Sequence, residues 1–261
     1  MNIESLNNNL VKENLLSRIV FLDEVDSTNK FASVNYAELP HDTLIITEFQ
    51  KMGKGRFERK WESSKGTNLM FTLLKELKID IDKIHNVIFY TSYMLFNTLK
   101  EILDDTLGKN LLLKWPNDVL LNRKKTAGIL LEVKNLKQPV KLFIIGIGLN
   151  VNETDFQSDN IVSATSLKKE TGKEFSREDI LEKFIINFYK NYNLLKESDK
   201  LIDEWKKNSF GIDEKISFSQ YEDDKEKSGY IKDIDHDGAI MIRFDDGSVK
   251  KFYSGEIKIK Y

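Results

Sequence analysis

The chain has 261 residues, of which 40 are basic and 42 acidic, so its formal net charge is −2. This balance argues against a general nucleic-acid binder, and the lack of cysteine excludes disulfides, thiolate metal sites and cysteine nucleophiles. No stretch has the roughly 18 uninterrupted apolar residues of a membrane span, and the N-terminus lacks the basic start and apolar stretch of a signal peptide. We therefore expect a globular protein of the cytoplasm.

Charge is distributed unevenly along the chain. Residues 1–50 carry three basic and eight acidic side chains, whereas residues 51–65 carry six basic and two acidic ones. Such a change over few residues is typical of a dedicated anion site. A solvated basic loop is the alternative interpretation.

Strand-like runs lie on either side of this basic segment. Thr43–Glu48 and Gly66–Leu74 have the pattern of short buried strands, so the segment is predicted to be a loop between them. An apolar stripe at helical spacing predicts a helix over Asp82–Asp105. Asn122–Lys125 is expected to be a solvated turn rather than a ligand site. Three more strand-like runs surround it, at Asn110–Lys114, Thr126–Val133 and Val140–Val151.

The last third of the chain changes from helical to strand-like patterning. Ser176 followed by Asp179 is a capping signal for a long helix that reaches Tyr192, and a further helical turn or two is expected from Leu201–Trp205. We predict a first domain of residues 1–210 and a small β-barrel of residues 211–261. The barrel is predicted from five short alternating runs separated by turn residues: Lys215–Phe218, Tyr230–Ile234, Ala239–Phe244, Val249–Tyr253 and Ile257–Lys260.

Two segments near the N-terminus combine groups that bind polar or anionic ligands. Asp26-Ser27-Thr28-Asn29 offers hydroxyls and backbone amides at a helix start, although ordinary capping also explains this motif. Gln50–Trp61 interleaves two glycines, which let the backbone approach a ligand, with phosphate-binding cations. It is not a Walker A loop, because no Gly-Lys-Ser/Thr follows at the required spacing.

A third segment, Lys114-Trp115-Pro116-Asn117-Asp118, follows a buried apolar run. A lysine at the end of a buried strand is costly unless its charge has a partner. Lys114 is therefore either half of a structural salt bridge with Asp118 or a ligand-binding cation. Glycines interrupt later strands at Gly128 and in Gly146-Ile147-Gly148, which indicates a bulge or the close approach of a ligand. Because no helix pattern follows them, a dinucleotide-binding fingerprint is excluded.

Together these motifs resemble those of the biotin–protein ligases, in the same order along the chain. The resemblance runs from Asp26–Asn29 through the Gly53–Trp61 loop and Lys114–Asp118 to Gly146–Asn150 and the barrel, and it covers about residues 20–261. The Lys-Trp-Pro-Asn-Asp string with the basic glycine loop is its most specific part. It implies an α+β fold, a mixed β-sheet flanked by helices as in class II aminoacyl-tRNA synthetases, followed by an SH3-like barrel.

The resemblance also implies an activity and its residues. Family members join biotin to ATP with Mg²⁺, forming biotinyl-5′-AMP, and transfer biotin to one lysine of a biotin carboxyl carrier protein or domain. Mg²⁺ would be held mainly by the ATP phosphates, with no metal site in the protein. The catalytic residues would be Lys114 and Arg56. The biotin site would comprise Ser27, Thr28, Asn29, Gln50, Gly53, Lys54, Gly55, Arg56, Lys114 and Gly128. The ATP and phosphate site would comprise Lys54, Arg56, Arg59, Trp61, Asn117 and Asn150.

The basic loop departs from the usual family pattern, because Lys54 replaces an arginine and Glu58 a glycine. Lysine loses the bidentate geometry of arginine. We expect residues 51–60 to be mobile in the free protein and ordered over the adenylate. Only about 20 residues precede the motifs, too few for the helix-turn-helix of some family members, so no DNA binding is expected. A homodimer is left open.

Two alternatives are retained. A lipoate–protein ligase shares the fold and the adenylation chemistry, but the Lys-Trp-Pro-Asn-Asp string and the barrel favour biotin. A non-catalytic biotin sensor would need no cations for phosphate, so Lys114 and Arg56 favour an enzyme.

Overall fold

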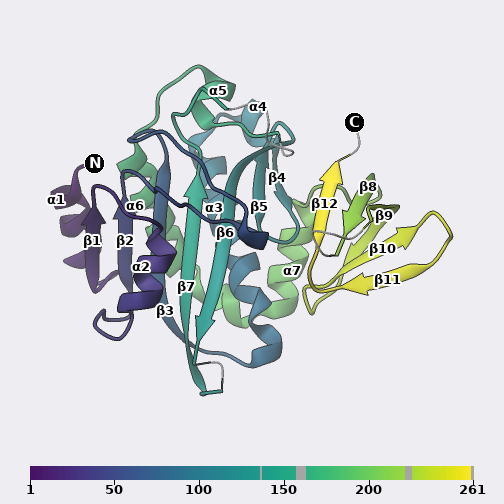
Figure 1. Cartoon of the computed structure of the whole chain (residues 1–261), viewed down its shortest axis with the longest axis horizontal. Helices are drawn as coiled ribbons and strands as arrows, with labels where there is room; N and C mark the ends of the chain where they lie inside the picture. Colours follow the sequence, from purple (N-terminus) through teal and green to yellow (C-terminus); the bar gives the residue numbers. More distant parts are fainter. Residues whose placement is uncertain (136, 157–162, 221–224, 260–261) are drawn as a thin grey trace.

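A seven-stranded mixed sheet forms the centre of the larger unit in the computed structural model, which describes residues 1–135, 137–156, 163–220 and 225–259 (Figure 1). The strand order is β1-β2-β3-β7-β6-β5-β4. β1 and β2 pair in parallel, and the other neighbours are antiparallel. The strands are β1 (Arg18–Leu22), β2 (Thr43–Thr47), β3 (Leu69–Lys78), β4 (Leu111–Lys114), β5 (Asp118–Leu121), β6 (Lys124–Lys134) and β7 (Val140–Leu149).

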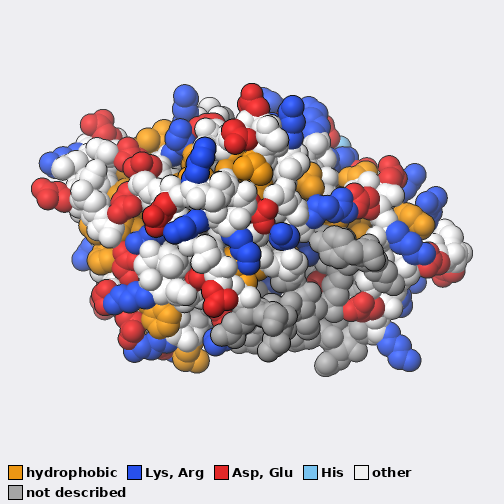
Figure 2. All heavy atoms as spheres, turned by 90° about the horizontal axis from the view of Figure 1, so that it is seen from above, with side chains coloured by type: hydrophobic (Ala, Val, Ile, Leu, Met, Phe, Trp, Pro, Cys, Tyr) orange, Lys and Arg blue, Asp and Glu red, His pale blue; other side chains and the backbone are white. Residues whose placement is uncertain are grey.

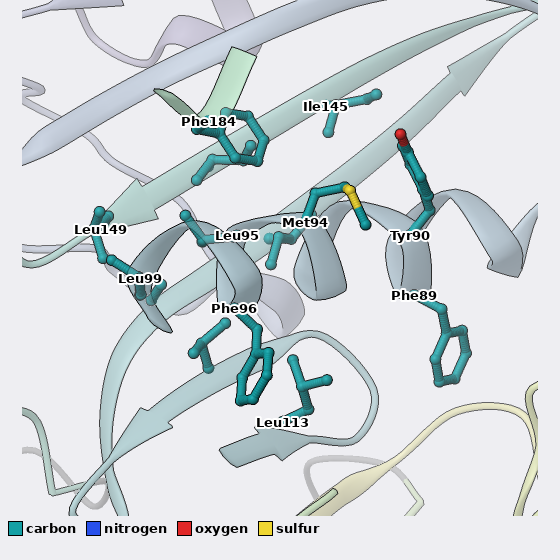
Figure 3. Close-up of a cluster of buried hydrophobic side chains, with 14 of the residues drawn as sticks. Phe89, Tyr90, Met94, Leu95, Phe96, Leu99, Leu113, Ile145, Leu149 and Phe184 are labelled. Atoms are coloured by element: carbon teal, nitrogen blue, oxygen red, sulfur yellow. The ribbon is translucent and has the colours of Figure 1, made fainter. Parts of the chain in front are cut away.

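Three helices cover one face of this sheet: α3 (His85–Ile102), α6 (Arg177–Lys190) and α7 (Ser198–Lys207). α3 lies at the centre of the main core. Figure 3 shows Leu99 of α3 beside Leu149 of β7, and Phe96 beside Leu113 of β4. Because α3 buries side chains around most of its circumference, its apolar stripe is wide and was predictable from the sequence.

The opposite face of the sheet is only partly covered. α2 (Thr28–Asn35) packs Ala32 against Ile45, Leu74 and Ile144 at one end of this face. The remaining area is left to the loop between β2 and β3. The short elements are α1 (Ile3–Leu6), the π-helix η1 (Asn7–Val11), η2 (Arg56–Glu58), η3 (Ile81–Lys83), α4 (Asp105–Gly108), α5 (Leu167–Thr171) and η4 (Tyr192–Lys196).

A second, antiparallel sheet forms the C-terminal unit, in the order β11-β10-β9-β8-β12. The ring of Phe218 on β8 lies 4.4 Å from that of Phe252 on β11, although these strands are not neighbours in the sheet. The sheet therefore curls over its own core like a small barrel, and the predicted fold class is confirmed. Its strands are β8 (Lys215–Ser219), β9 (Lys227–Ile234), β10 (Ile240–Phe244), β11 (Val249–Phe252) and β12 (Glu256–Ile259). Lys260, predicted to end the last strand, lies outside the described residues.

The C-terminal sheet packs against the β4–β5 edge of the main sheet (Figure 1). The Trp115 indole N–H donates to the carbonyl of Gly238 at 3.0 Å, and the Phe210 N–H donates to the carbonyl of Leu113 at 2.7 Å. Division of the chain into domains at Phe210 stays a prediction.

Most predicted elements are present, and two strands were not predicted. Ser176 caps α6 by accepting from the Asp179 N–H at 3.2 Å, as its motif indicated. β1 and β5 are short edge or hairpin strands whose patterns do not stand out.

The predicted turn at Asn122–Lys125 is wrong in its extent. Asn122 and Arg123, with φ of 50° and 62°, make a two-residue turn, and β6 begins at Lys124.

Charged side chains of both signs are mixed over the face in Figure 2, and hydrophobic ones are scattered among them. In the described part of the chain, no helix has the length and apolar character needed to span a bilayer.

Candidate active site

A cavity of about 760 Å³ lies on the sheet face that α2 leaves open. Its walls come from the start of α2, the loop after β2, the β4–β5 turn, β6, β7 and the barrel strand β12. The structure thus brings together segments that are far apart in the sequence. The cavity is lined by all but one of the predicted site residues: Ser27, Thr28, Asn29, Gln50, Lys54, Gly55, Arg56, Arg59, Trp61, Lys114, Asn117, Gly128 and Asn150.

Gly53 is the predicted site residue that lies behind the cavity wall. A Cβ at this position would lie 2.5 Å from the carbonyl oxygen of Trp61, and the Gly53 carbonyl accepts from the Trp61 N–H at 2.8 Å. The glycine is needed because the two ends of the basic loop cross here at close range. Its predicted contact with biotin stays a prediction.

One end of the cavity is polar and buried. Ser27, Thr28 and Asn29 are each at most 5% exposed. Ser27 does cap α2, because its side chain accepts from the Lys30 N–H at 3.5 Å. Thr28 has a different partner: its N–H and hydroxyl both donate to Gln50 Oε1, at 2.8 and 3.1 Å. Capping therefore explains Ser27 but not Thr28.

The glycines of β7 make room for the chain's own side chains. A Cβ at Gly146 would lie 2.1 Å from Asn29 Oδ1, and one at Gly148 would lie 2.5 Å from the Trp61 ring. β7 pairs with β3 and β6 without a register shift at these residues, so of the two interpretations, a bulge or the close approach of a ligand, the bulge is wrong for Gly146 and Gly148. The indole of Trp61 covers β7, and its buried Nε1 has no hydrogen-bond partner among the described residues.

The other end of the cavity is cationic, with Lys114 at its base. Lys114 ends β4 and is 6% exposed, and no ion pair or hydrogen bond joins its ammonium group to another described residue. Burial lowers the pKa of Lys114; Asp118 raises it and Lys125 lowers it further. The proposed Lys114–Asp118 salt bridge is absent, because Asp118 pairs with Lys125 at 2.7 Å.

Lys125 was not predicted to belong to the site, and the interpretation of its side chain as solvated is wrong. The register of β5 with β6 shifts between Val119 and Leu120, which leaves Thr126 as an extra, bulged residue. The bulge turns Lys125 onto the Gly128 face, where a Cβ on Gly128 would meet Lys125 Cε at 3.0 Å. A signal existed: regular alternation would place Lys125 in the core with Ala127 and Ile129, and a lysine there requires a bulge.

The basic loop forms a tight hairpin over the cavity. The Gly55 N–H donates to the Arg59 carbonyl at 2.7 Å, and Phe57 adopts a left-handed conformation with φ of 56°. The Arg56 guanidinium donates to Asn117 Oδ1 and to the Gly255 carbonyl, both at 3.4 Å, and burial lowers its pKa. The side chain of Glu58, which replaces a glycine of the family pattern, lies outside the described part.

The barrel contributes a carboxylate that the sequence did not indicate. Both terminal nitrogens of Arg59 donate to the carboxylate of Glu256 on β12. Arg59, predicted to bind phosphate, therefore ties the basic loop to the barrel in this structure. Asn117 and Asn150 each use their amide to hold a backbone carbonyl, that of Ile129 at 2.7 Å and that of Thr165 at 3.0 Å.

The fold and the cavity agree with comparisons to known proteins. The Biotin/lipoate A/B protein ligase family model matches residues 21–150, and the chain belongs to this family. A second match places it more narrowly: the Biotin protein ligase C terminal domain covers residues 220–259.

Relatives share a modest part of the sequence over most of the chain. Bifunctional ligase/repressor BirA of Bacillus subtilis is 28% identical over 248 residues, which cover 92% of this chain and 74% of the relative. Biotin--[acetyl-CoA-carboxylase] ligase of Paracoccus denitrificans is 29% identical over 62% of this chain and 67% of its own length. Biotin protein ligase from Aquifex aeolicus, solved in complex with biotin and ATP, is 25% identical with a TM-score of 0.75, covering 93% of this chain and 98% of that one.

Proposed function

We propose that the protein is an ATP-dependent ligase that activates biotin as biotinyl-5′-AMP and transfers it to a lysine of a biotin carboxyl carrier protein. One observation carries this proposal. A single cavity joins a buried, hydrogen-bonding end to a buried lysine that has no counterion among the described residues.

The polar end suits a ureido ring. Such a ring offers one carbonyl acceptor and two N–H donors, and Ser27, Thr28 and Gln50 supply hydroxyl and amide groups to meet them. Asn29 shapes the same end from the sheet side. Buried polar groups of this kind fix the orientation of a ligand as well as its affinity.

The cationic end suits attack of a carboxylate on the α-phosphate of ATP. A carboxylate oxygen bonds to phosphorus and pyrophosphate leaves, so two anions must be brought together. Opposite unit charges about 4 Å apart attract by about 4 kcal/mol at an effective dielectric constant of about 20. Lys114 and Arg56 are our choices to supply this attraction, because both are largely buried and neither is neutralised by a paired carboxylate among the described residues.

The same lysine suits the transfer step. The neutral amine of the acceptor lysine attacks the acyl carbon and negative charge develops on the carbonyl oxygen. The C–O bond to AMP then breaks, and the nitrogen loses a proton as the amide forms. A fixed cation beside that oxygen lowers the barrier without reorganising. We assign this role to Lys114.

Mg²⁺ belongs to the proposal as a companion of ATP. Of the carboxylates at the cavity, Asp118 and Glu256 are already paired with Lys125 and Arg59. Within the described ranges, no group of three or more His, Asp or Glu could hold a metal ion. We therefore propose that phosphate oxygens and water hold Mg²⁺, which neutralises phosphate charge.

Lipoate is a poorer fit for this cavity than biotin. The dithiolane ring of lipoate has no hydrogen-bonding groups, so it would leave the hydroxyls of Ser27 and Thr28 buried without ligand partners. Sites built to hydrogen-bond a ligand strongly reject analogues that lack those groups.

Incorporation of labelled biotin into a purified biotin carboxyl carrier domain, with and without Mg·ATP, tests the proposal. ATP-dependent labelling of one lysine is expected, and EDTA should abolish it. If the protein binds biotin but shows neither labelling nor ATP–pyrophosphate exchange, the result would support a sensor instead. If the protein neither binds nor transfers biotin but is active on lipoate, the result would support a lipoate ligase.

A further inference from the structure

Thr72 is a fully buried polar residue on β3 that does not line the cavity. Its strand partners are Ile45 on β2 and Gly146 on β7. The missing side chain at Gly146 leaves a hollow beside the Thr72 hydroxyl, and Asn29 from α2 fills it. Thr72 thus lies beneath the polar end of the cavity, in contact with residues that line it.

The orientation of Asn29 is fixed by its neighbours. Its amide nitrogen donates to the Leu130 carbonyl at 3.3 Å and to Glu132 Oε1 at 3.0 Å. Asn29 Oδ1 must therefore point the other way, where it meets the Thr72 hydroxyl at 2.7 Å. In the part of the chain that is described, Thr72 is the one hydrogen-bond donor to this oxygen.

The same hydroxyl begins a chain of donors that ends at the cavity. Thr72 donates to Thr28 Oγ1 at 2.8 Å, sharing its proton with Asn29, and the Thr28 hydroxyl donates to Gln50 Oε1 at 3.1 Å. Gln50 Oε1 also accepts from the Thr28 N–H. With its oxygen held by two donors, Gln50 keeps its Nε2 group for a ligand.

We propose that Thr72 is a positioning residue for ligand recognition: its hydroxyl fixes the direction of the donor chain Thr72→Thr28→Gln50, so that Gln50 presents a donor to a ligand carbonyl. This inference rests on the proposed function and identifies the feature of biotin that is read, the ureido carbonyl. Hydrogen bonds in such a chain polarise one another, so the first member influences the last.

Replacing Thr72 by valine keeps the shape and β-branching of the side chain and removes the hydroxyl. We expect the KM for biotin in the labelling reaction to rise by about 10-fold, because Asn29 Oδ1 and Thr28 Oγ1 lose a buried donor. The KM for ATP should change by less than about 2-fold. Thr72→Ser should restore the KM for biotin. Thr91→Val is the matched control, since Thr91 is buried in α3 and, among the described residues, its hydroxyl bonds only to Val87 of its own helix.

A second measurement separates positioning from general damage. In 2-iminobiotin the ring carbonyl is replaced by an imino group, which is protonated at neutral pH and therefore donates rather than accepts. The preference of the wild type for biotin, measured as the ratio of the two kcat/KM values, should fall several-fold in Thr72→Val and recover in Thr72→Ser.

The outcomes distinguish this inference from the proposed function. An unchanged biotin KM, an unchanged preference, or an equal loss in Thr91→Val would overturn the role of Thr72 while leaving the ligase intact. A wild type that neither binds nor transfers biotin would overturn both. The KM for ATP reports whether Thr72→Val is folded. A KM for ATP that rises as much as the KM for biotin would indicate general damage and would also count against positioning.

Discussion

Lys114 and Asp118 are cross-strand partners in the β4–β5 hairpin, yet they do not form a salt bridge. Asp118 turns instead to Lys125, which a bulge in β6 brings to the cavity face. At this end of the cavity two cations, Lys114 and Lys125, therefore lie near one carboxylate, that of Asp118. The excess positive charge is on the buried Lys114. Such an arrangement is unfavourable in an empty protein and favourable once an anion enters.

Removing the charge of Lys114 should slow chemistry more than binding. We expect Lys114→Met to lower kcat for biotin-dependent ATP–pyrophosphate exchange by about 100- to 1,000-fold, the usual effect of losing one preorganised charge. The Kd for biotin should change by less than about 5-fold, because that charge is needed most in the transition state. Lys124→Met is the control, since Lys124 pairs with Glu170 and does not line the cavity. A kcat equal to that of the control would contradict the role of Lys114.

The neighbours of Lys114 should move the alkaline limit of activity in opposite directions. Burial lowers the pKa of Lys114, so its charge, and the rate that depends on it, is lost as pH rises through that pKa. Asp118 raises this pKa and Lys125 lowers it. We expect the alkaline limb of the kcat profile to shift to lower pH in Asp118→Asn and to higher pH in Lys125→Met. Profiles of both variants that keep the wild-type limb would show that another group controls it.

Local patterns were enough to predict the elements that carry the fold. The apolar residues of α3 and α6 recur at helical spacing, and those of the barrel strands alternate, so each element can be predicted from its own residues. The residues of the cavity could be named because they form compact motifs. Their grouping in space could not be derived from composition or spacing, and it was expected only through the resemblance.

The missing parts depend on contacts between distant segments. Lys125 reaches the cavity through a bulge, which is a property of how β5 and β6 pair. Glu256 meets Arg59 across 197 positions of the chain. The β7 glycines were expected to mark a bulge or the close approach of a ligand, and the structure also places Asn29 and Trp61 against them. In each case the residue that determines the outcome belongs to a different segment of the chain from the motif itself.

The close approach at Gly146 gives a steric prediction. Gly146→Ala would place a methyl group about where Asn29 Oδ1 now lies, so the amide must move. We expect a loss of about 1–3 kcal/mol in the free energy of unfolding, as for other overpacked sites, and a biotin KM raised by about 10-fold. Gly108→Ala is the control, because its nearest neighbour would be 3.8 Å away. Chemical denaturation and labelling kinetics measure the two effects, and a normal biotin KM would show that Asn29 does not shape the site.

The Arg59–Glu256 pair predicts that the barrel limits opening of the basic loop. The loop contains Lys51, Lys54, Arg56, Arg59 and Lys60, so trypsin reports its exposure directly. We expect biotin with ATP to slow cleavage of wild-type protein, because the lid orders over the adenylate.

Glu256→Gln should speed tryptic cleavage of the ligand-free protein by about 2- to 5-fold. A partly exposed ion pair contributes about 0.5–1 kcal/mol, and its loss increases the population of the open loop by that factor. Glu214→Gln is the matched control: Glu214 pairs with Arg123 between the same two units but away from the cavity. Equal cleavage of both variants would show that Glu256 does not hold the loop. Equal cleavage of the wild type with and without ligands would show that residues 51–60 are not a lid.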